Sequence, residues 1–93
     1  MEFEKHGNGF RKLDENGKMV AQITYAPKDD NTVYADSTFV DPSLRGQGVA
    51  EKILDHMVME LKKDGKKIIP QCSYVVAQFE RNSEKYADVM ADK

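Results

Sequence analysis

Between residues 32 and 64 the sequence changes from a strand pattern to a helix pattern, and two glycines stand at the junction. Thr32 to Val40 is rich in β-branched and aromatic residues, which is typical of a β-strand. From Gln47 to Asp64, apolar residues recur every three or four positions, as in the broad stripe of an amphipathic helix. The junction reads Val40-Asp41-Pro42-Ser43-Leu44-Arg45-Gly46-Gln47-Gly48-Val49-Ala50. This order of strand, glycine loop and helix predicts an α/β fold.

Shorter strand and helix patterns lie on both sides of this region. Phe10 to Asp14 and Met19 to Tyr25 predict two strands, and Glu15-Asn16-Gly17 between them predicts a hairpin turn. Glu2 to His6 is a candidate edge strand. The other elements that we expect are a strand at Lys67–Pro70, a helix from about Cys72 to Arg81 and a last helix within Glu84–Met90. We therefore expect residues 1–93 to form a single α/β domain, in which two to three helices pack on a mixed sheet.

Composition and charge exclude several classes of function. The 93 residues carry 14 Lys and Arg against 16 Asp and Glu, a formal net charge of −2. This balance argues against a nucleic-acid partner, because binding to a phosphate backbone needs a basic face. No run of about 18 apolar residues predicts a membrane span, and residues 1–6 lack the apolar core of a secretion signal. Because Cys72 is the one cysteine, we expect no internal disulfide and a reducing, cytoplasmic location.

The glycine loop has the features of an anion-binding site. Gly46 and Gly48 lack a Cβ atom, so the backbone there is free to bend tightly and to approach a ligand. The first amides of the following helix have no intrahelical acceptor, and the helix dipole adds positive potential. Arg45 adds a fixed positive charge. Together these features favour a phosphate or pyrophosphate. The alternative is a tight turn that binds no ligand.

The loop resembles one family in particular. A Walker loop would end in Gly-Lys-Ser/Thr, and a dinucleotide-binding loop would need glycine at Glu51. Arg45-Gly46-Gln47-Gly48-Val49-Ala50 instead matches the Arg/Gln-x-x-Gly-x-Gly/Ala signature of the GNAT (GCN5-related N-acetyltransferase) superfamily. The resemblance implies that acetyl-CoA is the cosubstrate, with its pyrophosphate on the loop amides and its pantetheine arm on the backbone of the preceding strand. The implied binding residues are Phe39, Val40, Arg45, Gly46, Gln47, Gly48, Val49 and Ala50.

Most of the chain resembles small GNAT-like proteins of about this length. Residues 66–75 resemble their strand-to-helix junction, and residues 86–89 resemble their C-terminal helix. Two differences bear on catalysis. Ser37 stands where these relatives often carry a histidine, so a hydroxyl replaces a candidate base. Phe79 stands where larger members often place the tyrosine that protonates the leaving CoA thiolate.

Cys72 is the candidate catalytic residue. It follows a strand at the expected start of a helix, where the helix dipole favours the thiolate. Its position also matches the Pro-x-Cys motif of the small GNAT-like proteins. Three roles remain open: a carrier of a transient acyl group, a lining of the acyl end of the CoA channel, or a buried small hydrophobe.

Other candidates have simpler interpretations. His56 lies on the polar face of its helix, and we expect a solvated surface histidine. We expect Tyr74 and Tyr86 to be aromatic core residues rather than proton donors. Asp29-Asp30-Asn31 predicts a turn, because the spacing of a calcium loop is missing. With no zinc pattern in the sequence, we expect no metal.

Two functions remain open at this point. The first is an enzyme that transfers an acetyl group from acetyl-CoA to an unidentified primary amine, on a small molecule or a protein. Water, Asp36 or Ser37 would then relay the proton that the amine loses. The second is a non-catalytic acyl-CoA-binding or interaction module, which the missing acid and base favour. Release of free thiol with a panel of amines would separate the two.

Overall fold

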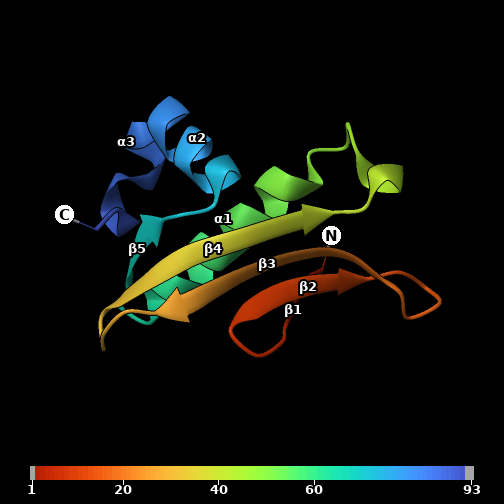
Figure 1. The fold of residues 1–93 in the computed structure, drawn as a ribbon, viewed down its shortest axis with the longest axis horizontal. Helices are drawn as coiled ribbons and strands as arrows, with labels where there is room; N and C mark the ends of the chain where they lie inside the picture. Colours follow the sequence, from red (N-terminus) through yellow and green to blue (C-terminus); the bar gives the residue numbers. More distant parts are fainter. Residues whose placement is uncertain (1, 92–93) are drawn as a thin grey trace.

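The computed structural model describes residues 2–91, which form a mixed five-stranded sheet with helices packed on one face (Figure 1). The elements in chain order are β1 (Glu4–Lys5), β2 (Gly9–Leu13), β3 (Met19–Pro27), β4 (Thr32–Val40), the short 3₁₀ helix η1 (Pro42–Leu44), α1 (Val49–Lys63), β5 (Lys67–Pro70), α2 (Ser73–Arg81), α3 (Ser83–Tyr86) and the 3₁₀ helix η2 (Ala87–Val89). The strands lie in the order β1-β2-β3-β4-β5. The first four strands pair antiparallel, and β5 pairs parallel to β4. The predicted α/β fold with a mixed sheet is therefore confirmed.

The hydrophobic core lies between the helices and one face of the sheet. Along β4, Val33 and Ala35 are buried while Tyr34 between them is not, which is the two-residue alternation of a strand. The predicted stripe on α1 supplies the other half of the core. Its fully buried members are Ile53, Leu54 and Met57, and burial of each such side chain contributes roughly 1.5–3 kcal/mol relative to exposure. The opposite face of the sheet has no helix packed on it within residues 2–91.

β4 has a β-bulge in its middle, and beyond this bulge it no longer pairs with β5. Thr24 pairs with Ser37 but the next residue, Tyr25, pairs with Ala35, so Asp36 is an extra residue in β4. Such a β-bulge bends the strand and redirects its side chains. Pairing with β5 ends at the same place, at Ala35. Beyond it β4 continues to Val40, while the chain after Pro70 turns away towards α2 (Figure 1).

Several predicted boundaries differ from those observed: β2, for example, is Gly9–Leu13 rather than Phe10–Asp14, and β3 continues to Pro27. α1 begins at Val49 rather than Gln47, because the two preceding residues belong to the loop. α2 begins at Ser73, and Cys72 is its N-cap. The predicted last helix is two short pieces, α3 and η2. Its two buried residues, Tyr86 and Val89, are three positions apart, a spacing that a 3₁₀ turn places on one face.

Candidate functional site

The loop between β4 and α1 is held by its own hydrogen bonds. The Asp41 carboxylate accepts from the amide of Ser43 at 2.9 Å and starts η1. The Arg45 amide donates to the Pro42 carbonyl at 3.2 Å and closes this turn. The next part of the loop has positive φ at both glycines, 83° at Gly46 and 71° at Gly48. A side chain at either position would strain the backbone, which explains why the sequence has glycine there.

The N-terminus of α1 faces this loop without a side-chain cap. Gly48 is the N-cap, and no side chain bonds to the first-turn amides. These amides have no acceptor inside the helix, so they are available to an anion. Glu51 in the first turn is favourable for the helix dipole but would oppose a bound anion. Arg45 is exposed beside the loop and offsets that charge.

The loop forms one wall of a cavity of about 230 Å³. The cavity is lined by Val40, Leu44, Arg45, Gly46, Gly48, Val49, Ala50, Glu51 and Tyr74. Most of the predicted binding residues therefore lie together. The side chains of Gln47 and Phe39 do not line the cavity, and Phe39 is 43% exposed. Tyr74 comes from α2, and no local sequence pattern links it to the loop.

Tyr74 is both a core contact and a wall of this cavity. Burial raises the pKa of its hydroxyl, and the negative charges of Glu51 and Asp55 raise this pKa further. The hydroxyl is therefore protonated at neutral pH and able to donate a proton. Phe79, which the family resemblance compares with a tyrosine, is 1% exposed and stacks on Tyr86 with ring centroids 4.8 Å apart. The prediction that Tyr86 is a core residue is confirmed.

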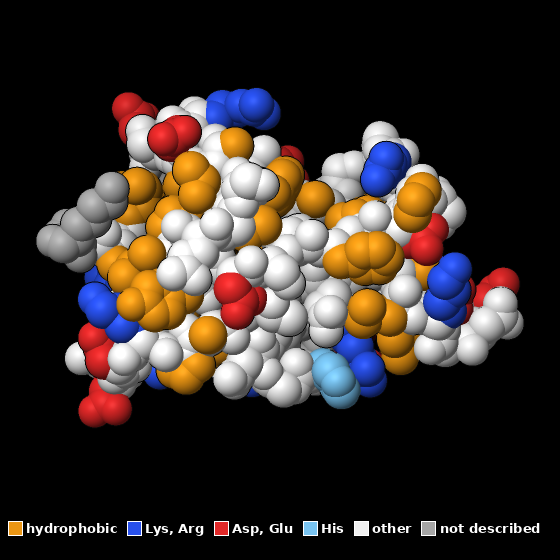
Figure 2. Space-filling model, viewed as in Figure 1, with side chains coloured by type: hydrophobic (Ala, Val, Ile, Leu, Met, Phe, Trp, Pro, Cys, Tyr) orange, Lys and Arg blue, Asp and Glu red, His pale blue; other side chains and the backbone are white. Residues whose placement is uncertain are grey.

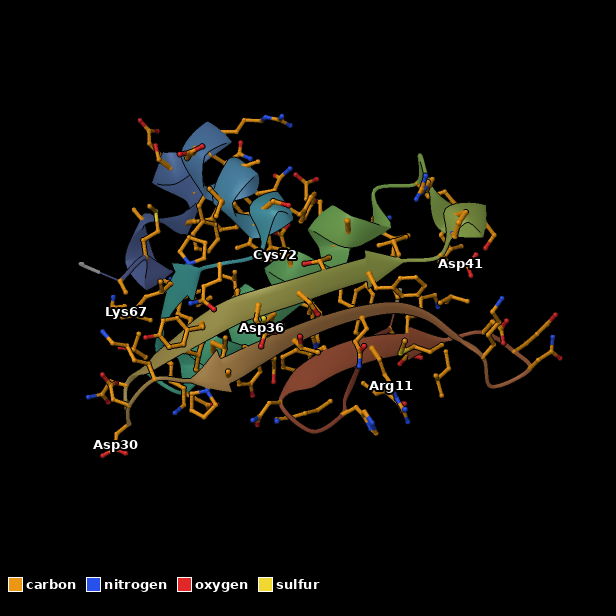
Figure 3. The ribbon with its side chains drawn as sticks, in the orientation of Figure 1. Arg11, Asp30, Asp36, Asp41, Lys67 and Cys72 are labelled. Atoms are coloured by element: carbon orange, nitrogen blue, oxygen red, sulfur yellow. The ribbon has the colours of Figure 1, made fainter. Side chains whose placement is uncertain are left out.

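Cys72 lies at the point where β4 and β5 separate (Figure 3). Its amide donates to the Ala35 carbonyl at 2.8 Å, and its thiol donates to the Thr38 hydroxyl at 3.4 Å. Burial raises the pKa of the thiol, but the thiolate form would accept hydrogen bonds from the Thr38 hydroxyl and from the amides of Val75 and Tyr74, and these lower the pKa overall. The thiol is half-buried, and Cys72 is the N-cap of α2, so it lies at a helix start as expected; its catalytic role stays a prediction.

Asp36 and Ser37, the two candidate proton relays, lie on the sheet face opposite the helices. The Thr24 hydroxyl on β3 donates to the Asp36 carboxylate, and it lies 2.9 Å from the Ser37 hydroxyl. Both Asp36 and Ser37 are exposed. The bulge brings these two consecutive residues beside the same threonine.

The sequence predicts that His56 is a solvated surface histidine, and the structure corrects this in part, because the residue is half-buried. Its ring meets the buried ring of Phe10 edge-on at 4.9 Å and lies 5.5 Å from the ring of Phe3. The N-terminal residues cover this side of α1, which a pattern read along the helix alone does not show. The predicted turn at Asp29–Asn31 is confirmed, because the Asn31 amide donates to the Asp29 carboxylate at 2.9 Å.

Residues 2–91 contain neither a candidate metal site nor a candidate membrane span. No group of three or more His, Cys, Asp and Glu side chains is placed to hold a metal ion there. In the same range, no helix has the length and apolar character needed to cross a membrane.

The structure combines a mixed sheet, a glycine loop at a helix N-terminus and two parallel strands that separate beyond Ala35. Residues 10–89 match the family model described as GCN5-related N-acetyl-transferase. The chain belongs to the GCN5-related N-acetyltransferase (GNAT) family. A comparison with curated proteins found no match.

Solved structures agree with this assignment. A GCN5-like protein from Staphylococcus aureus is 33% identical, with a TM-score of 0.80 over 99% of this chain and 89% of that one. A GNAT family N-acetyltransferase from Escherichia coli in complex with CoA is 18% identical, with a TM-score of 0.65 over 84% of this chain and 43% of that one. A GNAT family acetyltransferase from Elizabethkingia anophelis with acetyl-CoA bound is 16% identical, with a TM-score of 0.60 over 84% of this chain and 53% of that one. The chain spans about half the length of these two larger relatives.

Proposed function

We propose that the protein binds acetyl-CoA at the loop cavity and transfers the acetyl group to a primary amine. The observation that carries the proposal is the uncapped N-terminus of α1 behind a loop with two positive-φ glycines, which together wall a cavity. The pyrophosphate would accept hydrogen bonds from the first amides of α1, and the positive charge of Arg45 would lie beside its negative charge. The ligands of the Escherichia coli and Elizabethkingia anophelis structures support the choice of CoA.

The pantetheine arm would run along the free edge of β4. β5 pairs with β4 only as far as Ala35, so the backbone groups of Val40 that point to this edge have no strand partner among residues 2–91. Those of Phe39 point to β3, because the Asp41 amide two residues on donates to Val20 of β3. Unpaired backbone N–H and C=O groups need hydrogen-bond partners. The amide groups of the pantetheine arm supply donors and acceptors along its length, as a neighbouring strand would. The arm would then end near Thr38 and Cys72, where the two strands separate.

The reaction joins the amine nitrogen to the thioester carbon and breaks the carbon–sulfur bond. The ammonium form of the amine loses two protons: one leaves to solvent before attack, and the second replaces the proton that the acid gives to the leaving thiolate. A backbone N–H on the free edge of β4 would polarise the carbonyl. Tyr74 would supply the proton to the thiolate, because its hydroxyl is protonated and because it lies at the start of α2, two residues after Cys72. Asp36, Ser37 or a water would receive the other proton.

The alternative function is a non-catalytic acyl-CoA-binding module. The exposure of Asp36 and Ser37 favours it, because a general base in open solvent contributes less than one in a closed site. Both functions need the donor site, and only the first consumes acetyl-CoA. Release of free thiol with a panel of primary amines separates them.

Titration with CoA, followed through backbone amide chemical shifts, tests the donor site. We expect the largest changes at Gly46 to Val49 and smaller ones at Phe39 and Val40. Amides of the β1–β2 turn, at the other end of the sheet, serve as the internal control. If millimolar CoA leaves the loop amides unmoved, the proposal fails.

A further inference from the structure

We propose that the acceptor is a lysine side chain within a polypeptide, and that the helix-free face of the sheet binds this polypeptide in extended form, with the lysine ammonium at Asp36. This inference rests on the proposed acetyl transfer. It adds the class of acceptor and the surface that receives it. In Figure 3, Asp36 lies over the middle of β4 on the side turned to the viewer, while α1 runs behind the sheet.

The position of Asp36 connects this face with the predicted acetyl end of CoA. Cys72 contacts β4 on both sides of the bulge, through its amide to Ala35 and through its thiol to Thr38. Asp36 and Ser37 are the residues between these two contacts. An amine that approaches over Asp36 therefore arrives where β4 and β5 have separated, and it need not pass through the helical layer.

The Asp36 carboxylate is a suitable partner for the ammonium group of a lysine. Within the described part of the chain, its carboxylate accepts from the Thr24 hydroxyl and takes part in no ion pair. Two other charges on this face, Glu4 and Arg11, form an ion pair of 2.6 Å, and Lys67 of β5 donates to the Asp88 carbonyl. The face thus offers one negative charge without a cationic partner.

One exposed carboxylate does not hold a small amine well. An ion pair at an exposed site changes an equilibrium by no more than about fivefold, so useful affinity must come from additional contacts. Aromatic side chains lie on both sides of Asp36. Tyr34 is half-buried beside Ile69 of β5, and Phe39 is 43% exposed. Figure 2 shows this face with hydrophobic side chains towards both ends and little charge between them.

The spacing of these aromatic residues defines the form of the acceptor. Tyr34 and Phe39 are five residues apart on one strand, which corresponds to roughly 16 Å. Asp36 lies between them, so a chain that contacts both must continue on both sides of its amine. An internal lysine meets this condition. A free amino acid does not, and an N-terminal amine has residues on one side only.

The probe is a heptapeptide, acetylated at its N-terminus and amidated at its C-terminus. It has a central lysine, leucine two positions away on each side, and glycine elsewhere. In an extended chain these three side chains lie on one face. The first measurement is binding, followed by the amide shifts of residues 34–39 without CoA, which does not depend on turnover. The second is the rate of thiol release with acetyl-CoA.

We expect millimolar peptide to shift the amides of residues 34–39, and the same peptide with norleucine for lysine to shift them at least threefold less. Asp36→Asn should weaken peptide binding about fivefold and leave CoA affinity unchanged. Asp30→Asn is the matched control, because Asp30 is equally exposed but lies in the β3–β4 turn. Tyr34→Ser should weaken binding of the leucine peptide but not of a peptide with serine in both leucine positions.

Several outcomes would overturn the inference. These are unmoved amides at 34–39, an Asp36→Asn variant that binds peptide as the parent does, and free lysine or an N-terminal amine acetylated as fast as the peptide. The proposed function fails separately, through absence of CoA binding at the loop or of turnover with every amine.

Discussion

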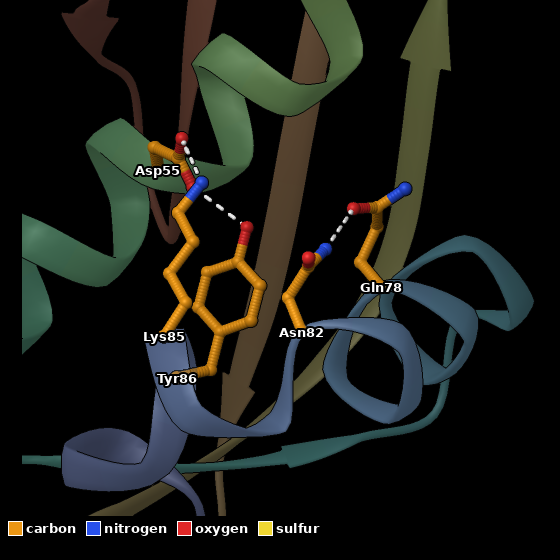
Figure 4. Close-up of polar contacts among 5 residues, drawn as sticks. All are labelled: Asp55, Gln78, Asn82, Lys85 and Tyr86. Atoms are coloured by element: carbon orange, nitrogen blue, oxygen red, sulfur yellow. Dashed lines mark hydrogen bonds and ion pairs between the residues drawn. The ribbon is translucent and has the colours of Figure 1, made fainter.

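The hydroxyl of Tyr86 donates a 2.7 Å hydrogen bond to the Asp55 carboxylate, and this bond fastens the C-terminal α3 to the middle of α1 (Figure 4). The second oxygen of the same carboxylate accepts from Lys85 at 2.9 Å. Tyr86 itself is 1% exposed and stacks on Phe79 of α2. One buried ring therefore connects α1, α2 and α3, and holds the helix that carries Tyr74 against the helix that carries the loop.

Tyr86→Phe should destabilise the fold by about 1–2 kcal/mol. The ring remains packed, but a hydrogen bond to a charged acceptor is lost. Urea unfolding followed by circular dichroism measures this loss. Lys85→Met is the control and should cost less than about 1 kcal/mol, because the Lys85–Asp55 pair is 47% and 39% exposed at its two side chains. Equal losses in the two variants would contradict the special role of the buried hydroxyl.

Stability should fall at alkaline pH, and Tyr86 should account for part of the fall. Burial and the hydrogen bond to Asp55 raise the pKa of Tyr86 far above its ordinary value of about 10. The contribution of a group with a raised pKa is fully present below its unfolded pKa. Above pH 10 the unfolded chain loses the proton and the folded chain keeps it, so the free energy of unfolding decreases by up to about 1.4 kcal/mol per pH unit. Unfolding midpoints at pH 8 to 11 should converge for the wild type and Tyr86→Phe. Parallel curves would contradict this prediction.

The elements that the sequence predicts best are those in which local pattern and tertiary packing agree. Thr32–Val40 and Lys67–Pro70 have the predicted bounds. Both are rich in β-branched residues, and each buries residues on one face of the sheet. The loop is equally local, since its two glycines adopt positive φ for reasons that lie within the loop itself. Such features need no knowledge of the rest of the chain.

The sequence patterns do not predict features that depend on contacts between two distant segments of the chain. Tyr74 of α2 lines the cavity together with residues of the loop and α1, and His56 is half-buried because Phe3 and Phe10 pack against its ring. The bulge at Asp36 is a property of the β3–β4 register. Neither strand alone carries a signal for it, because both retain a β-type composition through the irregularity.

Gly48→Glu should weaken CoA binding at least tenfold without unfolding the protein. A carboxylate at this position would face the pyrophosphate, and its side chain would occupy the space that the ligand needs. The space around Gly48 is open, so the cost to the fold is limited to backbone strain. Gly7→Glu is the matched control, because Gly7 also has positive φ in open space but lies between β1 and β2. Calorimetric titration with CoA compares the two, and unchanged affinity in a folded Gly48→Glu variant would place the site elsewhere.

Tyr74→Phe should lower kcat by about a hundredfold or more if this hydroxyl protonates the leaving thiolate. CoA affinity should change little, because the ring that lines the cavity is retained. Tyr25→Phe serves as the control, since Tyr25 lies on β3 away from the cavity. Thiol release with an accepted amine gives kcat, and a separate titration gives the CoA affinity. A Tyr74→Phe enzyme with normal kcat would remove this residue from the mechanism.

Cys72 is half-buried rather than a buried core residue, which leaves two of its three roles, and these predict different products. In a relay, the Cys72 thiolate attacks the thioester carbon, CoA leaves as the thiol, and the amine then takes the acetyl group and restores the cysteine. The lowered pKa of Cys72 and its place beside Thr38 are consistent with this step. Acetyl-CoA should then leave a hydroxylamine-sensitive mass addition on Cys72. Cys72→Ser should lose both the addition and transfer to amines.

A passive Cys72 predicts no covalent product. Cys72→Ala should then bind CoA nearly as tightly as the parent and keep its transfer rate. It should lose about 1 kcal/mol of stability, because the half-buried sulfur leaves a small void beside Thr38. Intact-mass analysis after brief incubation, with and without competing CoA, separates the two roles. Labelling that saturating CoA does not reduce would mean that the thiol reacts from outside the channel, and it would contradict both. We expect the passive result, because direct transfer to the amine needs no acyl-enzyme and Tyr74 already offers a proton to the leaving thiolate.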